Sequence, residues 1–548
     1  MGDGSGLSRR GFIGAAAGAT AAAAVGMGAG AAQAQPGSSG AGGPGGDLAL
    51  VNGKIHTFDE NNRVVSQVLI RDGKFAAVGS VGGGAGPRET INLHGRTVIP
   101  GIIDNHVHFV RIGQAVGHDL RLLETAFSIE AAQQMIADKA ATVPVGEFIT
   151  ALAGIARRQF GASPARFPNL QELDDAAPNH PVVLSELFAG QANTLGRDRL
   201  RALGVSVGDD GSIANQNDAY IALSQFLTPE TKRREMLSAA QYCLSTGLTT
   251  FMDDHGNFGQ PGQAGYLDRV TGHDHVMALW RERQLPVRLR LRFAVREGLD
   301  DPSLLDTWLN HKWLDLGDDI MQQSGIGEWA PRGGLYQDSL VKIANRSYTY
   351  HQHLISTGEI QAHLDALSQY VAENPDLPSP GELHWSGGHM NGMTPSQVQE
   401  ANELGLGIAA HGGFRYLTSN QSGPDFRMIL DLAEVPVGTG SDGARVAPIN
   451  PWPTVYHMVT GRNSAGELIN DGGQISREEA IRMYSGPQQG WFSREENLLG
   501  GIGVGRYADL VVLDKDFFDH NAVPDEEIRG MKSMLTIVGG QVRYNAEV

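Results

Sequence analysis

The chain has 548 residues, of which 41% are hydrophobic and 19% charged, so it is neither a single small module nor disordered as a whole. Its formal net charge of −18 provides no basic surface for a phosphate backbone, and we expect no nucleic acid partner. The single cysteine, Cys243, excludes a disulfide within this chain and a cysteine-based zinc site, whereas 18 histidines can supply nitrogen ligands to a metal.

Residues 1–34 have the pattern of an export signal. Arg9 and Arg10 precede an uncharged run of alanine and glycine that ends in the cleavage pattern Ala32-Gln33-Ala34, and this resembles a bacterial twin-arginine signal peptide. The run consists of small, weakly hydrophobic residues, which favours cleavage over an uncleaved membrane anchor. We therefore expect the twin-arginine export machinery to deliver the protein to a periplasmic or other extracytoplasmic location, with no stable membrane span after cleavage. Residues 35–46, rich in Gly, Pro and Ser, predict a flexible linker.

Both ends of the remaining chain predict β-hairpins and strands. Asn-Gly, Asp-Gly and Gly-Gly pairs separate short apolar runs, as in tight hairpin turns. The predicted hairpins and strands cover residues 48–58, 68–78, 508–513 and 535–544. Neither end has enough strands to bury a core alone. The sequence therefore predicts one small β-sandwich domain built from residues 47–97 and 499–548.

The middle of the chain, residues 98–498, alternates short apolar runs with helical stretches. The ten apolar runs cover residues 98–107, 148–152, 181–186, 249–253, 287–294, 320–329, 348–354, 383–385, 407–411 and 435–440. Alternating strands and helices indicate an α/β fold with a parallel sheet, and about eight such repeats indicate a closed (β/α)₈ TIM-type barrel. Because ten runs exceed eight, one or two belong to an insertion, which we place near residues 130–240.

A His-x-His pair follows the first run of this region. His106 and His108 are two residues apart in a strand, so their side chains point to the same face and can chelate one divalent ion. A lone pair of this kind is more often structural than metal-binding. This one follows a buried strand and Pro100-Gly101, at the carboxyl end of a barrel strand where active sites are built, and that position favours metal binding.

Four motifs in order resemble the amidohydrolase superfamily, in the extended branch that includes N-substituted formamide deformylases. They are Val-Ile-Pro-Gly-Ile-Ile-Asp-Asn-His-Val-His ending at His108, Gly-Leu-Thr-Thr ending at Thr250, Gly-Ser-Asp ending at Asp442, and Val-Gly-Arg-Tyr-Ala-Asp-Leu-Val-Val-Leu ending at Leu513. The resemblance implies one or two divalent ions, with zinc expected, and hydrolysis of an amide-type C–N bond of a small molecule by metal-activated water. The alternatives are an esterase or lactonase on the same scaffold and an exported binding protein without catalysis.

The resemblance also places the remaining metal ligands. His353 stands where the family carries its fifth-strand histidine, although His351 faces the same way and is a rival. His384 stands at the sixth-strand position. Asp442 corresponds to the eighth-strand aspartate, which touches the metal and accepts the proton of the attacking water, so we expect it to be the catalytic residue.

One position departs from the family pattern. Many relatives carry a lysine at the end of the fourth strand, where it becomes carboxylated and bridges two metals, but this chain has Gly327 there. Glu328 is the neighbouring acid and offers two oxygens that can bridge two ions directly. In the alternative, the site holds one ion and Glu328 binds substrate or forms an ion pair.

Four further polar residues near strand ends are weaker candidates for substrate contacts: Asp254, His389, His411 and Arg445. Asp254 can instead orient a metal-binding histidine. The sequence leaves the oligomeric state open, a homo-oligomer included.

Overall fold

The structure is a computed structural model, and it describes residues 48–80, 87–256, 272–294, 302–311, 314–328, 335–418, 421–444 and 446–548. The predicted export signal, the predicted linker and Arg445 lie outside the described residues. Within the part of the chain that is described, none of the helices combines the length and the apolar character needed to cross a membrane.

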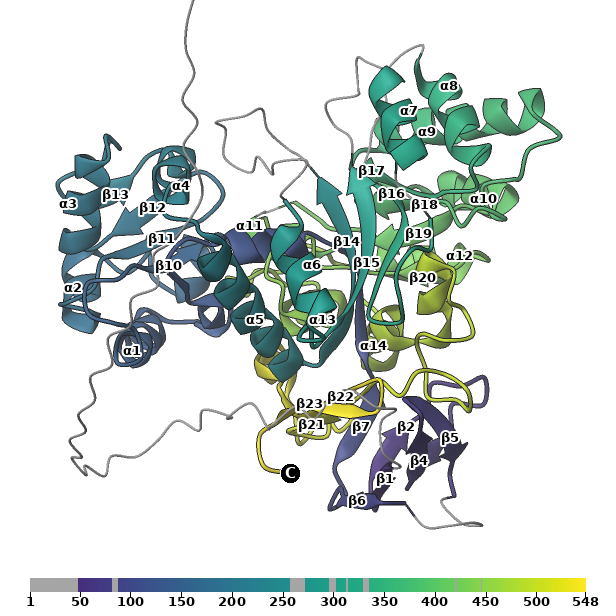
Figure 1. The fold of residues 1–548 in the computed structure, drawn as a ribbon, viewed down its shortest axis with the longest axis horizontal. Coiled ribbons are helices and arrows are strands. Elements are labelled where there is room, and N and C mark those ends of the chain that lie inside the picture. Colours follow the sequence, from purple (N-terminus) through teal and green to yellow (C-terminus); the bar gives the residue numbers. More distant parts are fainter. Residues whose placement is uncertain are drawn as a thin grey trace, which may run out of the picture. The chain divides into compact units, whose positions relative to one another are not determined.

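Eight parallel strands form the central sheet (Figure 1). In chain order they are β8 (Ile102–Val107), β14 (Leu248–Gly256), β15 (Arg288–Ala294), β16 (Met321–Gly327), β17 (Thr349–Leu354), β18 (Ser386–His389), β19 (Gly407–Ala410) and β20 (Val437–Gly438). Each strand pairs in parallel with the next one along the chain.

Backbone hydrogen bonds join the last strand region to the first and close the sheet. The Asn105 amide donates to the Thr439 carbonyl at 3.2 Å, and the Asp442 amide donates to the His106 carbonyl at 2.9 Å. The predicted (β/α)₈ barrel is confirmed.

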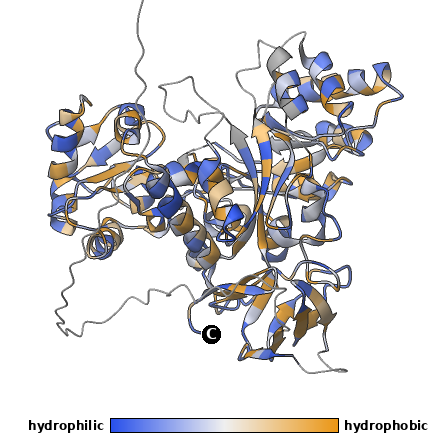
Figure 2. Ribbon diagram, viewed as in Figure 1, coloured by the Kyte–Doolittle hydropathy of each residue, from blue (hydrophilic) through white to orange (hydrophobic). Residues whose placement is uncertain are grey.

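Helices follow the barrel strands along the chain. They are α5 (Pro229–Thr246), α6 (Asp274–Arg281), α7 (Pro302–His311), α8 (Leu335–Ala344), α9 (Thr357–Glu373), α10 (Pro395–Leu404), α11 (Gly413–Thr418), α12 (Phe426–Leu432), α13 (Pro451–Thr460) and α14 (Arg477–Ser485). Helix α9 shows why they form: Ser356 and Glu359 make a capping box at its start, and Ile360, Leu364 and Leu367 bury one face. Figure 2 shows the resulting mixture of hydrophobic and hydrophilic residues on the helices.

Two further sheets share one hydrophobic core. One contains β1 (Leu48–Val51), β4 (Val68–Arg71), β5 (Lys74–Val78) and β6 (Glu89–Asn92); the other contains β2 (Lys54–His56), β3 (Val64–Val65), β7 (Thr97–Pro100), β21 (Leu510–Leu513), β22 (Ser533–Val538) and β23 (Gln541–Asn545). Leu50, Ile70, Leu510 and Ile537 are among the buried residues of this core. Strands from both ends of the chain therefore build one small β-sandwich, as predicted.

The first predicted hairpin, residues 48–58, is wrong. Its two halves, β1 and β2, belong to different sheets: β1 pairs with β4 and β6, whereas β2 pairs with β3 and β7. Asn52 has a left-handed backbone with φ of 58°, so the turn exists, but it carries the chain from one sheet to the other. The other two predicted hairpins form, as β4 with β5 and β22 with β23.

An additional sheet lies between β8 and β14 in the chain. It contains β9 (His118–Asp119), β10 (Ile149–Leu152), β11 (Val182–Ser185), β12 (Gly190–Ala192) and β13 (Ser212–Ile213), with α1 (Ile129–Ala140), α2 (Leu170–Ala176), α3 (Thr194–Ala202) and α4 (Gln216–Ser224). Alternate residues of β11 enter two cores, Leu184 one and Val183 the other, so both faces of this sheet are covered. The predicted runs 148–152 and 181–186 are β10 and β11 of this insertion.

Three histidines of helices α6, α9 and α13 are buried. Burial lowers the pKa of His275 in α6 and of His457 in α13 to about 4, and the pKa of His363 in α9 to about 3. In the unfolded chain a histidine has a pKa of about 6.5. Below pH 6.5 the unfolded chain therefore binds protons at these histidines, whereas the folded protein keeps them neutral.

This predicts that the free energy of unfolding falls as the pH drops from about 6.5 towards 4, by up to about 1.4 kcal/mol per pH unit for each histidine. Urea unfolding at about pH 7 and about pH 5 measures the loss. His363→Gln should reduce it. The matched variant His520→Gln, at a side chain that is 72% exposed, should not. An equal loss in wild type and His363→Gln would contradict the assignment.

Candidate metal centre at the carboxyl ends of the barrel strands

Six side chains that can bind a metal converge where five barrel strands end. They are His106 in β8 and His108 directly after it (together the β8 histidines), Glu328 after β16, His353 from β17, His389 from β18, and Asp442 after β20. All but His353 are buried, and the His353 side chain is 24% exposed. Because carboxyl ends of parallel barrel strands meet at one rim, residues 336 positions apart, such as His106 and Asp442, become neighbours.

The first donor set joins the β8 histidines to two carboxylates. His108 Nε2 lies 3.3 Å from Asp442 Oδ1 and 3.4 Å from Glu328 Oε2. His106 Nε2 lies 3.6 Å from the same Asp442 oxygen and 3.8 Å from Glu328 Oε1. Two nitrogens and two carboxylates therefore face a common centre.

The second donor set shares Glu328. His353 Nδ1 is in hydrogen-bond contact with Glu328 Oε1. His389 Nε2 lies 2.8 Å from His353 Nδ1 and 3.6 Å from the same Glu328 oxygen. The Glu328 carboxylate thus stands between the two donor sets and reaches both.

These residues fit a divalent ion. A tetrahedral zinc with ligands about 2.0 Å away has about 3.3 Å between neighbouring ligand atoms, close to the separations in the first donor set. His106 Nε2 and Glu328 Oε2 are buried and have no hydrogen-bond partner among the described residues. Buried polar atoms are rarely left without a partner, and an ion between these groups would satisfy them.

The charges of the site also call for a cation. Burial raises the pKa of the Glu328 carboxyl, but hydrogen bonds from His353 and His389 outweigh burial and hold that pKa well below its usual range. The Asp442 pKa is lowered against burial in the same way by His106 and His108. Burial and the neighbouring His353 lower the pKa of His389 to about 4, so His389 is neutral at pH 7. Two ionised carboxylates are thus surrounded by imidazoles that are good ligands when neutral.

Three of the six residues have a left-handed backbone, which is uncommon for residues other than glycine. Glu328 has φ of 45°, His389 of 69° and Asp442 of 57°. Each stands at the point where a barrel strand ends, so the turn of the backbone aims its side chain at the centre. Such local strain clusters at functional sites.

The structure corrects one predicted ligand, His384. This residue precedes β18 and lies at the amino end of the strand; its ring stacks on Trp491 with 4.8 Å between ring centroids. His384 Nδ1 donates to the Trp491 carbonyl at 2.8 Å, and its Nε2 lies 3.1 Å from Glu496. The sixth strand is Ser386-Gly387-Gly388-His389, which has no apolar side chain, so an apolar pattern places this strand too early. His389, predicted as a substrate contact, takes the place at the centre.

The other predicted residues lie one layer deeper or outside the described residues. Asp254, His351 and His411 are buried beneath the six residues, where His351 Nε2 lies 2.9 Å from His106 Nδ1. His353, rather than the rival His351, joins Glu328. Sequence analysis did not single out Arg292, which lies beside Asp254.

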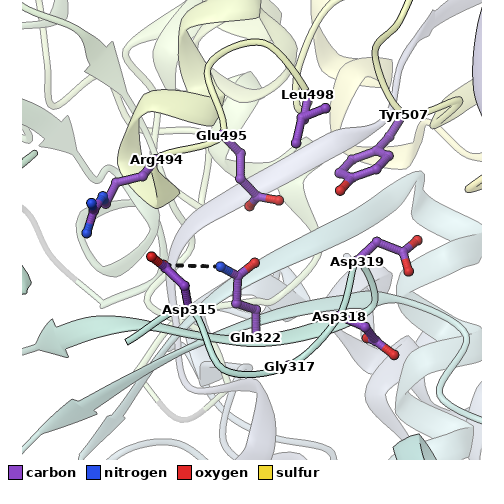
Figure 3. Close-up of a pocket in the computed structure, with 9 residues that line it drawn as sticks. All are labelled: Asp315, Gly317, Asp318, Asp319, Gln322, Arg494, Glu495, Leu498 and Tyr507. Carbon is purple, nitrogen blue, oxygen red and sulfur yellow. Dashed lines mark hydrogen bonds between the residues drawn. The ribbon is translucent and has the colours of Figure 1, made fainter. Parts of the chain in front are cut away.

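A pocket of about 380 Å³ lies at the opposite end of the barrel, beside the amino ends of β15 and β16 (Figure 3). Several of its lining residues are acidic, but two of them are paired with buried arginines of β15. Asp319 accepts from Arg288 at 3.0 Å and Glu495 accepts from Arg290 at 2.6 Å. None of the clustered histidines lines this pocket, so the pocket is separate from the histidine cluster.

The model of the amidohydrolase family (Amidohydro_3) matches residues 89–544. The chain belongs to the amidohydrolase family. This confirms the resemblance drawn from the sequence motifs. The amidohydrolase is 30% identical to N-substituted formamide deformylase of Arthrobacter pascens over 158 residues, which cover 28% of this chain and 29% of that protein. It is 21% identical over 543 residues to a Bacillus subtilis (strain 168) protein that carries the name amidohydrolase YtcJ, covering 90% and 98% of the two chains.

A solved structure with the same fold is the zinc complex of atrazine chlorohydrolase from Arthrobacter aurescens TC1. Its TM-score is 0.54 at 14% identity, and the match covers 91% of this amidohydrolase and 97% of that chain. The chain spans about half, or less, of the length of the first curated relatives that it matches. The comparisons therefore assign the family and the fold.

The corrected position of the sixth-strand histidine gives a test of the centre. His389→Ala removes a nitrogen of the second donor set, and we expect it to weaken zinc binding by about tenfold or more. Competition with a coloured chelator measures the affinity. His384→Ala is the matched control: it removes the stack on Trp491 but should leave zinc affinity unchanged. Equal weakening in both variants would show that the centre does not use His389.

Proposed function

We propose that this amidohydrolase is a hydrolase with two divalent metal ions, most simply zinc, that cleaves an amide-type C–N bond of a small molecule. The observation that carries the proposal is the Glu328 carboxylate, which stands between two sets of nitrogen donors and contacts both. A carboxylate in this position can bridge two ions, as the carboxylated lysine does in relatives.

The proposal assigns the ligands by donor set. His106, His108 and Asp442 would hold one ion, His353 and His389 the other, and Glu328 both. When bound, divalent ions lower the pKa of a water towards neutrality and polarise the substrate carbonyl.

Asp442 is the residue best suited to move the proton. Its Oδ1 lies 3.3 Å from His108 Nε2, and its Oδ2 lies 3.9 Å from His389 Nδ1. The imidazoles keep its pKa below the usual range, so the carboxylate is ionised at neutral pH. Asp442 would take the proton of the attacking water and return it to the leaving nitrogen.

The choice of an amide over an ester rests on the family and on the deformylase that resembles part of the chain. The same site can support an esterase or lactonase, because water activated by the ions that these residues would hold could attack either carbonyl. A panel of small amides, esters and lactones, assayed with the zinc-loaded protein, separates these reactions. Hydrolysis of esters or lactones alone would favour the alternative, and no turnover at all would contradict the proposal.

Asp442→Asn should lower kcat on the best substrate by about 10²- to 10⁴-fold, because the amide cannot accept the proton. Steady-state kinetics measure the loss, and elemental analysis should find that most of the metal remains. Asp425→Asn, at an exposed cap of α12, is the control and should keep full activity. Normal turnover in a metal-loaded Asp442→Asn protein would assign the proton transfer to another group.

Glu328→Gln tests the bridge. Wild-type protein purified without chelator should contain close to two equivalents of transition metal. The variant should fall towards one, because the amide is a weak bridging ligand. Glu359→Gln, which keeps the cap of α9, should retain both ions. A wild-type protein with a single ion would favour the mononuclear alternative, in which Glu328 faces the substrate.

A further inference from the structure

We propose that Asp254 is a positioning residue that orients both metal-binding histidines of β8, His106 through its carboxylate and His108 through its backbone carbonyl. The inference rests on the proposed function and adds to it a layer of side chains beneath the metal ligands. None of these side chains would touch an ion or the substrate.

Two contacts of Asp254 define this role. Its Oδ2 lies 3.1 Å from His106 Nδ1, a nitrogen that also lies 2.9 Å from His351 Nε2. Its backbone carbonyl accepts a hydrogen bond from His108 Nδ1 at 2.7 Å. All of these acceptors require the proton to be on Nδ1. When it is neutral, each ring therefore presents the lone pair of Nε2, the atom that faces Glu328 and Asp442. One residue at the end of β14 thus selects the tautomer of two ligands on the neighbouring strand.

Arg292 holds the Asp254 carboxylate in place. It is 1% exposed, and its Nη1 lies 3.3 Å from Asp254 Oδ2. Nη1 also donates to the Asn105 carbonyl at 3.0 Å, and Nη2 donates to the Phe492 carbonyl at 2.9 Å. Because carbonyls of two separate segments fix the guanidinium, the carboxylate beside it has little freedom to turn away from His106.

The same pair explains why glycine stands at position 327. A Cβ built on Gly327 would lie 1.9 Å from Asp254 Oδ1 and 2.8 Å from Arg292 Cβ. Asp254 and Arg292 therefore fill the space beside the fourth strand in which many relatives carry a lysine. A side chain at position 327 would displace the Asp254 carboxylate that orients His106. The acidic residue that serves the metal site here is accordingly the next one in the chain, Glu328.

A metal ion in this deeper layer is the competing interpretation. His106, His351 and His411 are close enough to share an ion, and neither ring nitrogen of His411 has a hydrogen-bond partner among the described residues. Two observations favour positioning instead. First, His351 Nδ1 lies 2.8 Å from Ser386 Oγ; if Nδ1 carries the proton, Nε2 is free to accept a hydrogen bond from His106. Second, the positive charge of Arg292, beside Asp254, repels a further cation.

Asp254→Asn is the test, because it keeps the shape and the backbone carbonyl but removes the charge that faces His106. The affinity for Co²⁺ and Zn²⁺, measured by chelator competition, should fall by about 10- to 100-fold. In the Co²⁺-loaded protein, NMR should show faster solvent exchange of the paramagnetically shifted His106 Nδ1–H, while the His108 Nδ1–H is retained.

Asp253→Asn is the matched control, an adjacent buried aspartate whose Oδ2 accepts from the Val110 amide at 2.7 Å. It should bind both metals as wild type does. If circular dichroism shows that Asp254→Asn does not fold, Arg292→Lys carries the same test, since it keeps the positive charge but loses the fork of carbonyl contacts.

The outcomes separate this inference from the proposed function. Wild-type affinity and unchanged Nδ1–H exchange in Asp254→Asn would overturn the positioning role and leave the proposed function intact. A wild-type protein that binds neither Co²⁺ nor Zn²⁺ would overturn both. A third equivalent of metal that is lost in His411→Ala would assign the deeper layer as a metal site and overturn the positioning role.

Discussion

Two carboxylates, Glu328 and Asp442, lie within 3.9 Å of imidazole nitrogens in a place that solvent barely reaches, and Glu328 is also in hydrogen-bond contact with His353. An unpaired carboxylate in such surroundings would cost several kcal/mol, so the arrangement is stable only when positive charge accompanies it. The barrel supplies the geometry, since the carboxyl ends of its strands converge. The histidines supply nitrogens that can serve a proton or a metal ion. The chemistry of the rim follows from the need to balance the negative charge of the two buried carboxylates.

Buried charges are also paired with opposite charges further down the barrel interior. Strand β15 places Arg288, Arg290 and Arg292 on one side, all buried, and each meets an acid: Asp509, Glu495 and Asp254. Removing one member of a buried ion pair commonly costs about 3 to 5 kcal/mol, because the other member is left unpaired. Since Asp509 directly precedes β21 of the small domain, the first of these pairs, Arg288 with Asp509, also ties the small domain to the barrel.

The sequence predicts most of the fold because its signals are local. Apolar runs mark seven of the eight barrel strands, and spacing alone pairs His106 with His108. The failures also have physical causes. The sixth strand contains Ser and Gly instead of apolar residues, so the prediction selected His384 in place of His389. The sequence offers an orienting role for Asp254 as an alternative, but it does not reveal the contacts on which the proposed role depends, those of Arg292 and of the Asp254 backbone carbonyl. The alternating Arg-Leu-Arg-Leu-Arg of β15 was an available signal, because arginine on every second residue of a central strand requires buried partners.

The barrel closes at a seam between β8 and the segment that follows β20. Besides the backbone bonds, Asp104 accepts from the Ser441 amide at 2.9 Å and from the Ser441 hydroxyl, which anchors the turn that carries Asp442. Half of the first donor set is therefore encoded near residue 106 and completed near residue 442. A ribosome must release more than 330 further residues before the two halves can meet, so a partly synthesised chain has no complete first donor set. The complete first donor set therefore exists only in chains in which the ring of strands has closed.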